Sequence, residues 1–264
     1  MKTAVRIEKV FKQQTRHLLS VLKKKERSLS ENDFHSIRVA IKKIQALFGL
    51  VEKSDPSFHQ KKNFAPFKLV FEQAGQIRDK EVMQAILHDH PYNASIEKFE
   101  FDLYRQINRE KKQFFKLIKS SLLKNINHNR TIVSDFIDHI HNKTATKYLK
   151  KKTNAIHDVL LNGQVDASNL HEVRKRIKDI YYIQKMIESK NRQVARTDQI
   201  QDLLGQWHDG RVLLQELDKY LESNHMTAKE NAAYQSLKKR MTKENENQFN
   251  AIMNQKSTLI NLFA

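Results

Sequence analysis

Two stretches of the sequence repeat one set of side chains that could bind an anion. Each set has a histidine, an arginine three residues later and a lysine four residues after the arginine. The residues are His35, Arg38 and Lys42 in the first stretch and His171, Arg174 and Lys178 in the second. On an α-helix this spacing places the three side chains within a stripe about 60° wide. Arginine offers paired hydrogen bonds to phosphate oxygens, lysine a point charge, and histidine a donor that is neutral or charged. The pattern therefore predicts two short helix faces that could each bind an anion.

The elements that must position these faces are predicted to be helices. Apolar residues recur at helical spacing, and only 5 Gly and 3 Pro interrupt the 264 residues, which leaves little turn chemistry for strands. Ser30 and Asp33 have the spacing of a helix start just before the first histidine. The periodicity predicts helices over residues 3–26, 31–52, 66–74, 77–89, 94–124, 145–161, 196–204, 206–222 and 227–255. We therefore predict an all-α fold.

The net charge of +18 indicates a polyanionic partner, because self-repulsion of this size disfavours a compact chain. Nucleic acid, anionic lipid and condensed phosphate are the candidate classes. No window approaches the roughly 18 apolar residues of a membrane span, and charges interrupt any signal-like core behind Met1. The absence of cysteine fits a cytoplasmic location.

Further basic residues recur at helical spacing outside the two histidine stretches. They are Arg6, Lys9 and Arg16, then Lys43, then Arg105, Arg109, Lys112 and Lys116, and then Lys147 and Lys151. The stripe within 94–124 contains no acidic residue, whereas a solvated helix face normally mixes both signs of charge. We include all of these cations among the candidate anion-binding residues.

The sequence indicates an internal duplication. Besides the two histidine stretches, residues 74–82 align with residues 204–212, in the same order and at nearly the same offset. We predict one domain over 1–264, built from a helical bundle at 1–128, a connecting helix at 129–143 and a second bundle at 144–264. A pseudo-twofold axis would relate the bundles and place the two histidine helices around a basic central cavity or groove. A closed channel and an open groove both remain open.

The second pair of aligned segments suggests supporting residues rather than ligand contacts. These residues are Gly75, Arg78 and Asp79 in the first segment and Gly205, His208 and Asp209 in the second. We expect the glycines to adopt positive φ where a helix ends. The aspartates are expected to cap the next helix or to hold the arginines and lysines of the two stripes. Arg78 and His208 could support the site or contact the ligand.

With these motifs in the same order, the chain resembles the CHAD family (conserved histidine α-helical domain) over nearly its whole length. The resemblance implies two helical bundles around a basic cavity that binds inorganic polyphosphate. It also implies a non-catalytic binding or targeting module, possible localisation to polyphosphate granules, and neither a metal nor a cofactor. Five positions depart from the family pattern: Gln45 and Tyr181 replace arginine, Asp179 replaces a basic residue, Ala74 replaces leucine and His208 replaces asparagine. These changes predict a less basic second half.

Two other functional classes compete with this interpretation. A nucleic-acid-binding helical protein would fit the charge, but no zinc-finger spacing or RNA-binding signature occurs, and aromatic residues do not interleave with the basic stripes. Competition between polyphosphate and nucleic acid would separate the two. An enzyme is disfavoured because the His208–Asp209 pair, of the kind seen in metal phosphohydrolases, aligns with Arg78–Asp79. The close pairs His88/His90 and His139/His141 point about 200° apart on a helix, which is unsuited to holding a metal ion.

Overall fold

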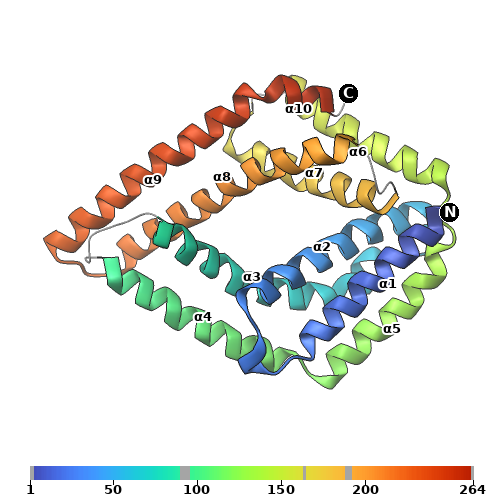
Figure 1. The fold of residues 1–264 in the computed structure, drawn as a ribbon, viewed down its shortest axis with the longest axis horizontal. Coiled ribbons are helices and arrows are strands. Elements are labelled where there is room, and N and C mark those ends of the chain that lie inside the picture. Colours follow the sequence, from blue (N-terminus) through green and yellow to red (C-terminus); the bar gives the residue numbers. More distant parts are fainter. Residues whose placement is uncertain (1–2, 90–95, 163–164, 188–191, 263–264) are drawn as a thin grey trace.

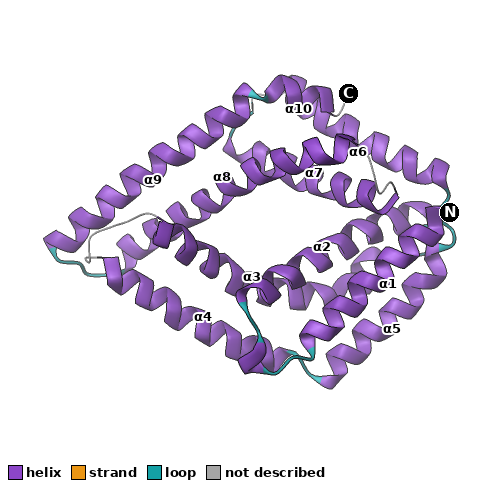
Figure 2. Cartoon of the chain, in the orientation of Figure 1, coloured by secondary structure: helices purple, strands orange, loops and turns teal. Residues whose placement is uncertain are grey.

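The computed structural model describes residues 3–89, 96–162, 165–187 and 192–262 and consists of helices joined by short connections (Figure 2). The elements are α1 Thr3–Leu22, η1 Glu26–Ser28, α2 Glu31–Ser54, α3 Gln60–Asp89, α4 Glu97–Leu117, α5 Ser120–Ile137, α6 Asn142–Asn162, α7 Ala167–Ile187, α8 Arg192–Ser223, α9 Ala228–Asn254 and α10 Lys256–Leu262. Within these ranges there is no strand, which confirms the all-α prediction. None of the described helices is long and apolar enough to cross a membrane.

The helices form two groups that meet through their central members. Figure 1 shows α1 to α5 on one side of the molecule and α6 to α10 on the other. The two groups are joined where α2 packs on α7 and α3 packs on α8. The helices that carry the two histidine stretches therefore lie side by side.

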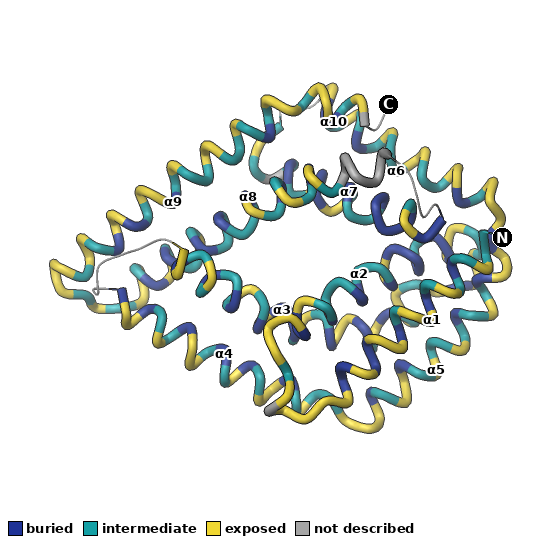
Figure 3. Tube along the Cα trace, in the orientation of Figure 1, coloured by how far each residue is buried: buried dark blue, intermediate teal, exposed yellow. Residues whose placement is uncertain are grey.

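Three hydrophobic cores hold this arrangement together, with the buried faces of the helices turned inward (Figure 3). One core joins α1 to α5 with the start of α6 and the end of α7. A second lies among α6, α7, α8, α9 and α10. The third joins α3 and α4 to α8 and α9. The second core lies within α6 to α10, whereas the first and the third contain residues of both groups of helices.

The predicted helix ends at Gly75 and Gly205 are wrong. Helix α3 runs without interruption through Pro66 and Gly75, and α8 runs through Gly205. No described glycine has a positive φ. Pro66 lies inside α3, where proline removes one hydrogen bond to the preceding turn, and the burial of Phe64 and Phe67 in the hydrophobic core keeps the segment helical.

Two other boundaries differ from the prediction. The long helix expected over 94–124 is divided at Ile118 and Lys119, so that α4 and α5 are separate helices. The connecting helix expected at 129–143 is not an independent element, because residues 129–137 form the second half of α5 and α6 begins at Asn142. The apolar periodicity continues across the break, and this is why the sequence did not reveal it.

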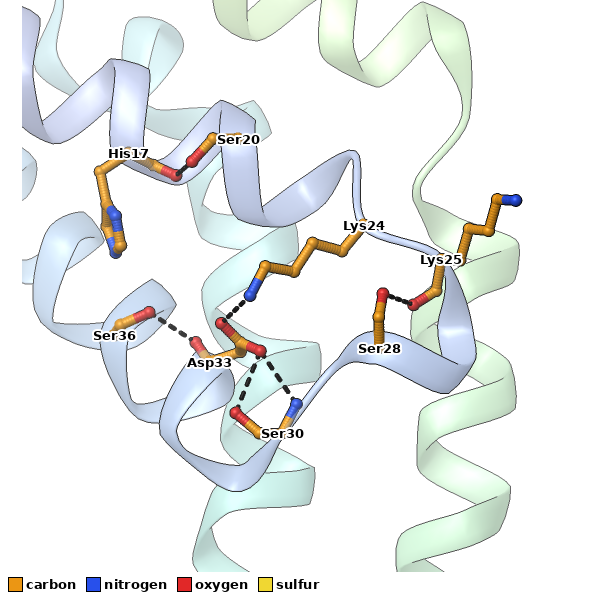
Figure 4. Close-up of polar contacts among 8 residues, drawn as sticks. All are labelled: His17, Ser20, Lys24, Lys25, Ser28, Ser30, Asp33 and Ser36. Atoms are coloured by element: carbon orange, nitrogen blue, oxygen red, sulfur yellow. Dashed lines mark hydrogen bonds and ion pairs between the residues drawn. The ribbon is translucent and has the colours of Figure 1, made fainter.

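Helix α2 begins where the sequence predicts, at a cap built around Asp33 (Figure 4). The backbone N–H of Ser30 donates to Asp33 Oδ2 at 2.9 Å, and Lys24 Nζ donates to Asp33 Oδ1 at 2.8 Å. The carboxylate thereby ties the segment after α1 to the first turn of α2. This contact fixes the start of the helix that carries His35, Arg38 and Lys42.

Candidate anion-binding site

The two predicted basic stripes meet at one chamber. Helix α2 supplies Arg38 and Lys42, and α7 supplies His171, Arg174 and Lys178, to the wall of a cavity of about 620 Å³. The remaining lining residues are Gln45, Ala46, Gly49, Gln60, Phe71, Tyr148, Lys152, Glu172, Lys175, Arg176, Asp179, Tyr182 and His208. Exposed side chains among them, such as Gln45 and Lys175, show that the chamber opens to solvent.

One member of the two stripes lies apart from the chamber. His35 is exposed at the start of α2 and lines none of the described cavities, whereas its counterpart His171 is half-buried in the chamber wall. Partial desolvation of the ring and the neighbouring cations, Arg78 foremost, lower the pKa of His35. The two histidines therefore occupy different environments despite their matched spacing.

The cations of α2 are held by an aromatic ring as well as by a carboxylate. The Arg38 guanidinium carbon lies 4.6 Å from the centroid of the Phe71 ring, and Lys42 Nζ lies 5.7 Å from it. Arg38 also makes an ion pair of 3.6 Å with Asp79. A ring face orients a cation without neutralising it. These two side chains therefore remain available to an anion in the chamber.

Burial and mutual repulsion make the charged state of the chamber costly. Burial, the neighbouring Lys178 and then Arg38 and Arg174 lower the pKa of Lys42 to about 7. Burial and then Arg174 lower the pKa of Lys178 to about 8. Arg174 is 9% exposed, and its Nε has no hydrogen-bond partner among the described residues. An anion in the chamber would relieve both the repulsion and the missing hydrogen bond.

The second half contributes a pair of histidines. The rings of His171 and His208 lie 4.6 Å apart at an angle of 30°. Burial, Arg174 and His171 lower the pKa of His208 to about 3, so this ring is neutral near pH 7 and can donate a hydrogen bond without adding charge. Its counterpart Arg78 is a charged side chain that lies 3.9 Å from Glu81.

The glycine and aspartates of the second motif position the arginines. A Cβ atom at Gly75 would lie 2.1 Å from Arg38 Nη1, so the missing side chain lets the guanidinium lie against α3. Asp79 is paired with this same guanidinium, and Asp209 adds negative charge beside Arg174 and Lys178. At Gly205 nothing lies within 4 Å of an added Cβ, and the structure gives no reason for glycine there.

The other predicted cations lie outside the chamber. Arg105, Arg109, Lys112 and Lys116 are exposed on α4, and Lys9, Arg16, Lys147 and Lys151 are exposed on α1 and α6. Arg6 donates to the carbonyl of Ile187 at 2.9 Å and so fastens α1 to the end of α7. Lys43 is half-buried, 3.5 Å from Gln14 Oε1. These residues could contact only the parts of a ligand that extend beyond the chamber.

Several chamber residues were not singled out from the sequence. Lys152 lines the wall, 5.2 Å from the Tyr148 ring centroid and 2.7 Å from Asp179. Asp179 stands where the family pattern has a basic residue, and its carboxylate also pairs with Lys152. Both effects make the second half of the chamber less basic. The spacing of Tyr148 and Lys152, four residues apart on a basic helix, was the available signal. Arg176, which donates to the Ala155 carbonyl at 3.1 Å, had no such signal.

Comparisons with known proteins agree with this fold. The model of the CHAD domain family matches residues 9–218, most of the chain. The chain belongs to the CHAD family. It is similar to the crystal structure of the CHAD domain from the plant Ricinus communis, with a TM-score of 0.71, 10% identity, and coverage of 98% of this chain and 88% of that one. It is also similar to PptA from Streptomyces chartreusis, with a TM-score of 0.68, 11% identity, and coverage of 96% and 99% respectively. A search of curated proteins found no match.

The chamber of this CHAD domain has the chemistry of an anion receptor. Its arginines can form paired hydrogen bonds with phosphate-like oxygens, and its lysines add charge. Within the described ranges, no three His, Asp or Glu side chains come together as a metal site would require. The convergence of arginine and lysine side chains on one cavity is an arrangement that can bind a polyanion.

Proposed function

We propose that this CHAD domain binds inorganic polyphosphate in the chamber between α2 and α7. One observation carries the proposal: Arg38, Lys42, Arg174 and Lys178 converge on one cavity from two helices. Among the described residues, only Arg38 of these four forms an ion pair with a carboxylate. A chain with about one negative charge per phosphate supplies the missing counter-charges at close spacing.

Polyphosphate fits the chamber better than nucleic acid does. Bases need exposed aromatic faces for stacking. In the chamber, cations lie over Phe71 and Tyr148, and Tyr182 is 7% exposed. A ligand made only of phosphates uses the cations and leaves the rings where they are. When the two polyanions are mixed at equal phosphate concentration, long-chain polyphosphate is expected to displace DNA or RNA.

The proposed role is binding or targeting without catalysis. The arginines and lysines of the chamber bind phosphate oxygens by charge and hydrogen bonding, which needs no chemical step. Incubation with polyphosphate and Mg²⁺ is expected to release no phosphate, and release would contradict this role. A cytoplasmic location with association to polyphosphate granules belongs to the same proposal.

Calorimetric titration with long-chain polyphosphate tests the proposal. The site variant replaces Arg38, Lys42, Arg174 and Lys178 by alanine. The matched control replaces four exposed lysines that line no described cavity, Lys23, Lys25, Lys124 and Lys229. Both variants lose four basic side chains, and the control loses at least as much charge, so only a specific chamber predicts weaker binding by the site variant.

We expect the site variant to lose at least about a hundredfold in affinity, because each charge-assisted hydrogen bond contributes roughly 1.5–3 kcal/mol. The control should lose much less, and wild-type binding should weaken as salt rises. Equal affinity of a folded site variant and the wild type would refute the chamber as the binding site.

A further inference from the structure

The chamber is separated from a second, smaller cavity by one layer of side chains. Arg38, Lys42, Arg174 and His208 line both cavities, and the smaller one has a volume of about 60 Å³. Its other lining residues are Asp79, Val82, Asp209 and Val212. The basic layer comes from α2, α7 and α8, whereas the layer behind it comes from α3 and α8.

Equivalent positions of the two sequence repeats face each other in the small cavity. The residues that line it include three matched pairs, which are Arg38 and Arg174, Asp79 and Asp209, and Val82 and Val212. The cavity therefore lies where corresponding parts of the two halves meet. A phosphate chain threaded between the halves would have to pass through it.

The chemistry of this passage opposes a phosphate chain. A volume of about 60 Å³ corresponds to about two waters in the bulk liquid. Asp79 pairs with Arg38 at 3.6 Å and has a side chain that is 53% exposed. A chain passing this point would have to break that ion pair and then meet two carboxylates at short range.

The region beyond the passage offers no compensating charge. A cavity of about 300 Å³ adjoins it through the shared residues Val82 and Asp209. Asp89 and Glu244 also line this third cavity, and its lining contains no lysine, arginine or histidine. A polyanion therefore gains contacts on the chamber side of the passage and repulsion on the other side.

We propose that the chamber binds a phosphate chain side-on, through an internal segment, and that the chain is not threaded between the two halves. Asp79 and Asp209 determine this mode by placing carboxylates directly behind the four basic residues. The inference rests on the proposed function, since it specifies how the same ligand occupies the same site. It has a direct consequence: binding requires no free chain end.

The test uses the intact protein and three polyphosphates of equal length, each much longer than the chamber. One has free ends, one carries a bulky amine joined to one terminal phosphate as a phosphoramidate, and one is blocked in this way at both ends. Kd is measured by calorimetry and the association rate by stopped flow. The control for specific binding is the site variant with alanine at positions 38, 42, 174 and 178, from here on called the chamber variant.

Side-on binding predicts Kd values for the three ligands that agree within about threefold. This corresponds to differences in binding free energy of less than about 0.7 kcal/mol. It also predicts association rates that agree within about threefold for the three ligands, because every internal segment is a target whatever the state of the chain ends. A doubly blocked chain that binds more than about threefold more weakly than the free chain would overturn the inference. If none of the three chains binds, the proposed function itself fails.

Discussion

At the scale of single residues, the contact between Gly75 and Arg38 shows how a missing side chain serves the site. Gly75 lies inside α3 with ordinary helical geometry, so its backbone does not require glycine. Its value is the space it leaves for the Arg38 guanidinium. Gly205 has the equivalent sequence position and no such neighbour, which makes the two glycines a matched pair.

Replacing each glycine by alanine should separate stability from binding. Gly205→Ala is expected to raise the free energy of unfolding by about 0.5–1 kcal/mol, the usual helix-interior gain, with unchanged polyphosphate affinity. Gly75→Ala gains the same propensity but displaces Arg38, so we expect affinity to fall by about tenfold. Urea denaturation and calorimetry measure the two quantities. An unchanged affinity of Gly75→Ala would show that the position of Arg38 does not matter for binding.

The lowered pKa of Lys42 predicts proton uptake on binding. A bound polyanion favours the charged ammonium and raises its pKa from about 7, so near pH 8 the complex holds more protons than the free protein. Affinity is therefore expected to fall as pH rises from 7 to 9. Titrations in buffers of different ionisation enthalpy measure the uptake.

Lys42→Arg is the control, because arginine stays charged and should reduce the uptake.

The stability of the free protein has the opposite pH dependence from its affinity for polyphosphate. The unfolded chain binds more protons than the folded chain between pH 7 and about 10, so the free energy of unfolding should rise with pH over this range. Absence of uptake in wild-type protein near pH 8 would contradict this account.

Sequence reasoning at the residue scale found the cations of the chamber but not their surroundings. Arg38, Lys42, Arg174 and Lys178 follow from helical spacing alone. The exposed position of His35 could not be predicted, because spacing along α2 does not show which part of this helix its neighbours cover. The role of Phe71 was equally hidden, since its contact with Arg38 joins different helices.

At the scale of elements, the basic stripe of α4 tests whether charge alone binds the ligand. Arg105, Arg109, Lys112 and Lys116 are exposed and lie outside the chamber. Replacing all four by alanine should weaken affinity much less than the chamber variant does, while slowing association and reducing the salt dependence. Stopped-flow rates at several salt concentrations provide the measurement. A loss as large as that of the chamber variant would show that α4 belongs to the main site.

The cap of α2 makes a separate prediction about stability. Burial raises the pKa of Asp33, but its hydrogen bonds with Lys24 and Ser30 outweigh this effect and leave the pKa below its usual value. The carboxylate therefore stabilises the fold above about pH 4 and loses this effect as the pH falls further. Asp33→Ala should lower the free energy of unfolding by about 1 kcal/mol at pH 7.

Denaturation at low pH provides the internal control for Asp33. Once the wild-type carboxyl is protonated, wild type and variant should differ much less in stability. A difference that is independent of pH would assign the effect to packing of the side chain and not to its charge.

Helix type and approximate extent could be read from the sequence, but helix continuity could not. Apolar periodicity predicted α2 and α9 almost to the residue. Gly75, Gly205 and Pro66 were read as breaks, yet tertiary packing keeps α3 and α8 helical through them. The opposite error occurred at Ile118, where good helix formers span a real break.

At the scale of the whole molecule, the positive charge and the shared third core act against each other. The net charge of +18 favours expansion, while the core formed by α3, α4, α8 and α9 holds the halves together. A ligand between α2 and α7 adds attraction where repulsion is strongest. We therefore expect polyphosphate to stabilise the fold.

Thermal unfolding with and without polyphosphate measures this effect. At a ligand concentration of 100 Kd the stabilisation should be about 2.7 kcal/mol, which shifts the midpoint by several degrees. The chamber variant should show little shift. A similar shift in both proteins would point to general charge screening.

The third core explains why the whole molecule was harder to predict than its parts. The apolar residues of α4 and α9 predicted which face of each helix is buried. They did not predict which helices cover those faces. The internal repeat suggested two separate bundles, whereas Phe99 of α4 contacts Tyr220 and Tyr234 of the second half. Such contacts join distant parts of the sequence and leave no periodic trace. The pseudo-twofold relation itself stays a prediction.

The single layer of arginines between the chamber and the small cavity has a further consequence. A ligand that draws Arg38 and Arg174 toward the chamber draws them away from Asp79 and Asp209. The two carboxylates would then face less positive charge, although no ligand touches them. Their vibrational bands in an isotope-edited infrared spectrum would thus report occupancy of the chamber from its far side.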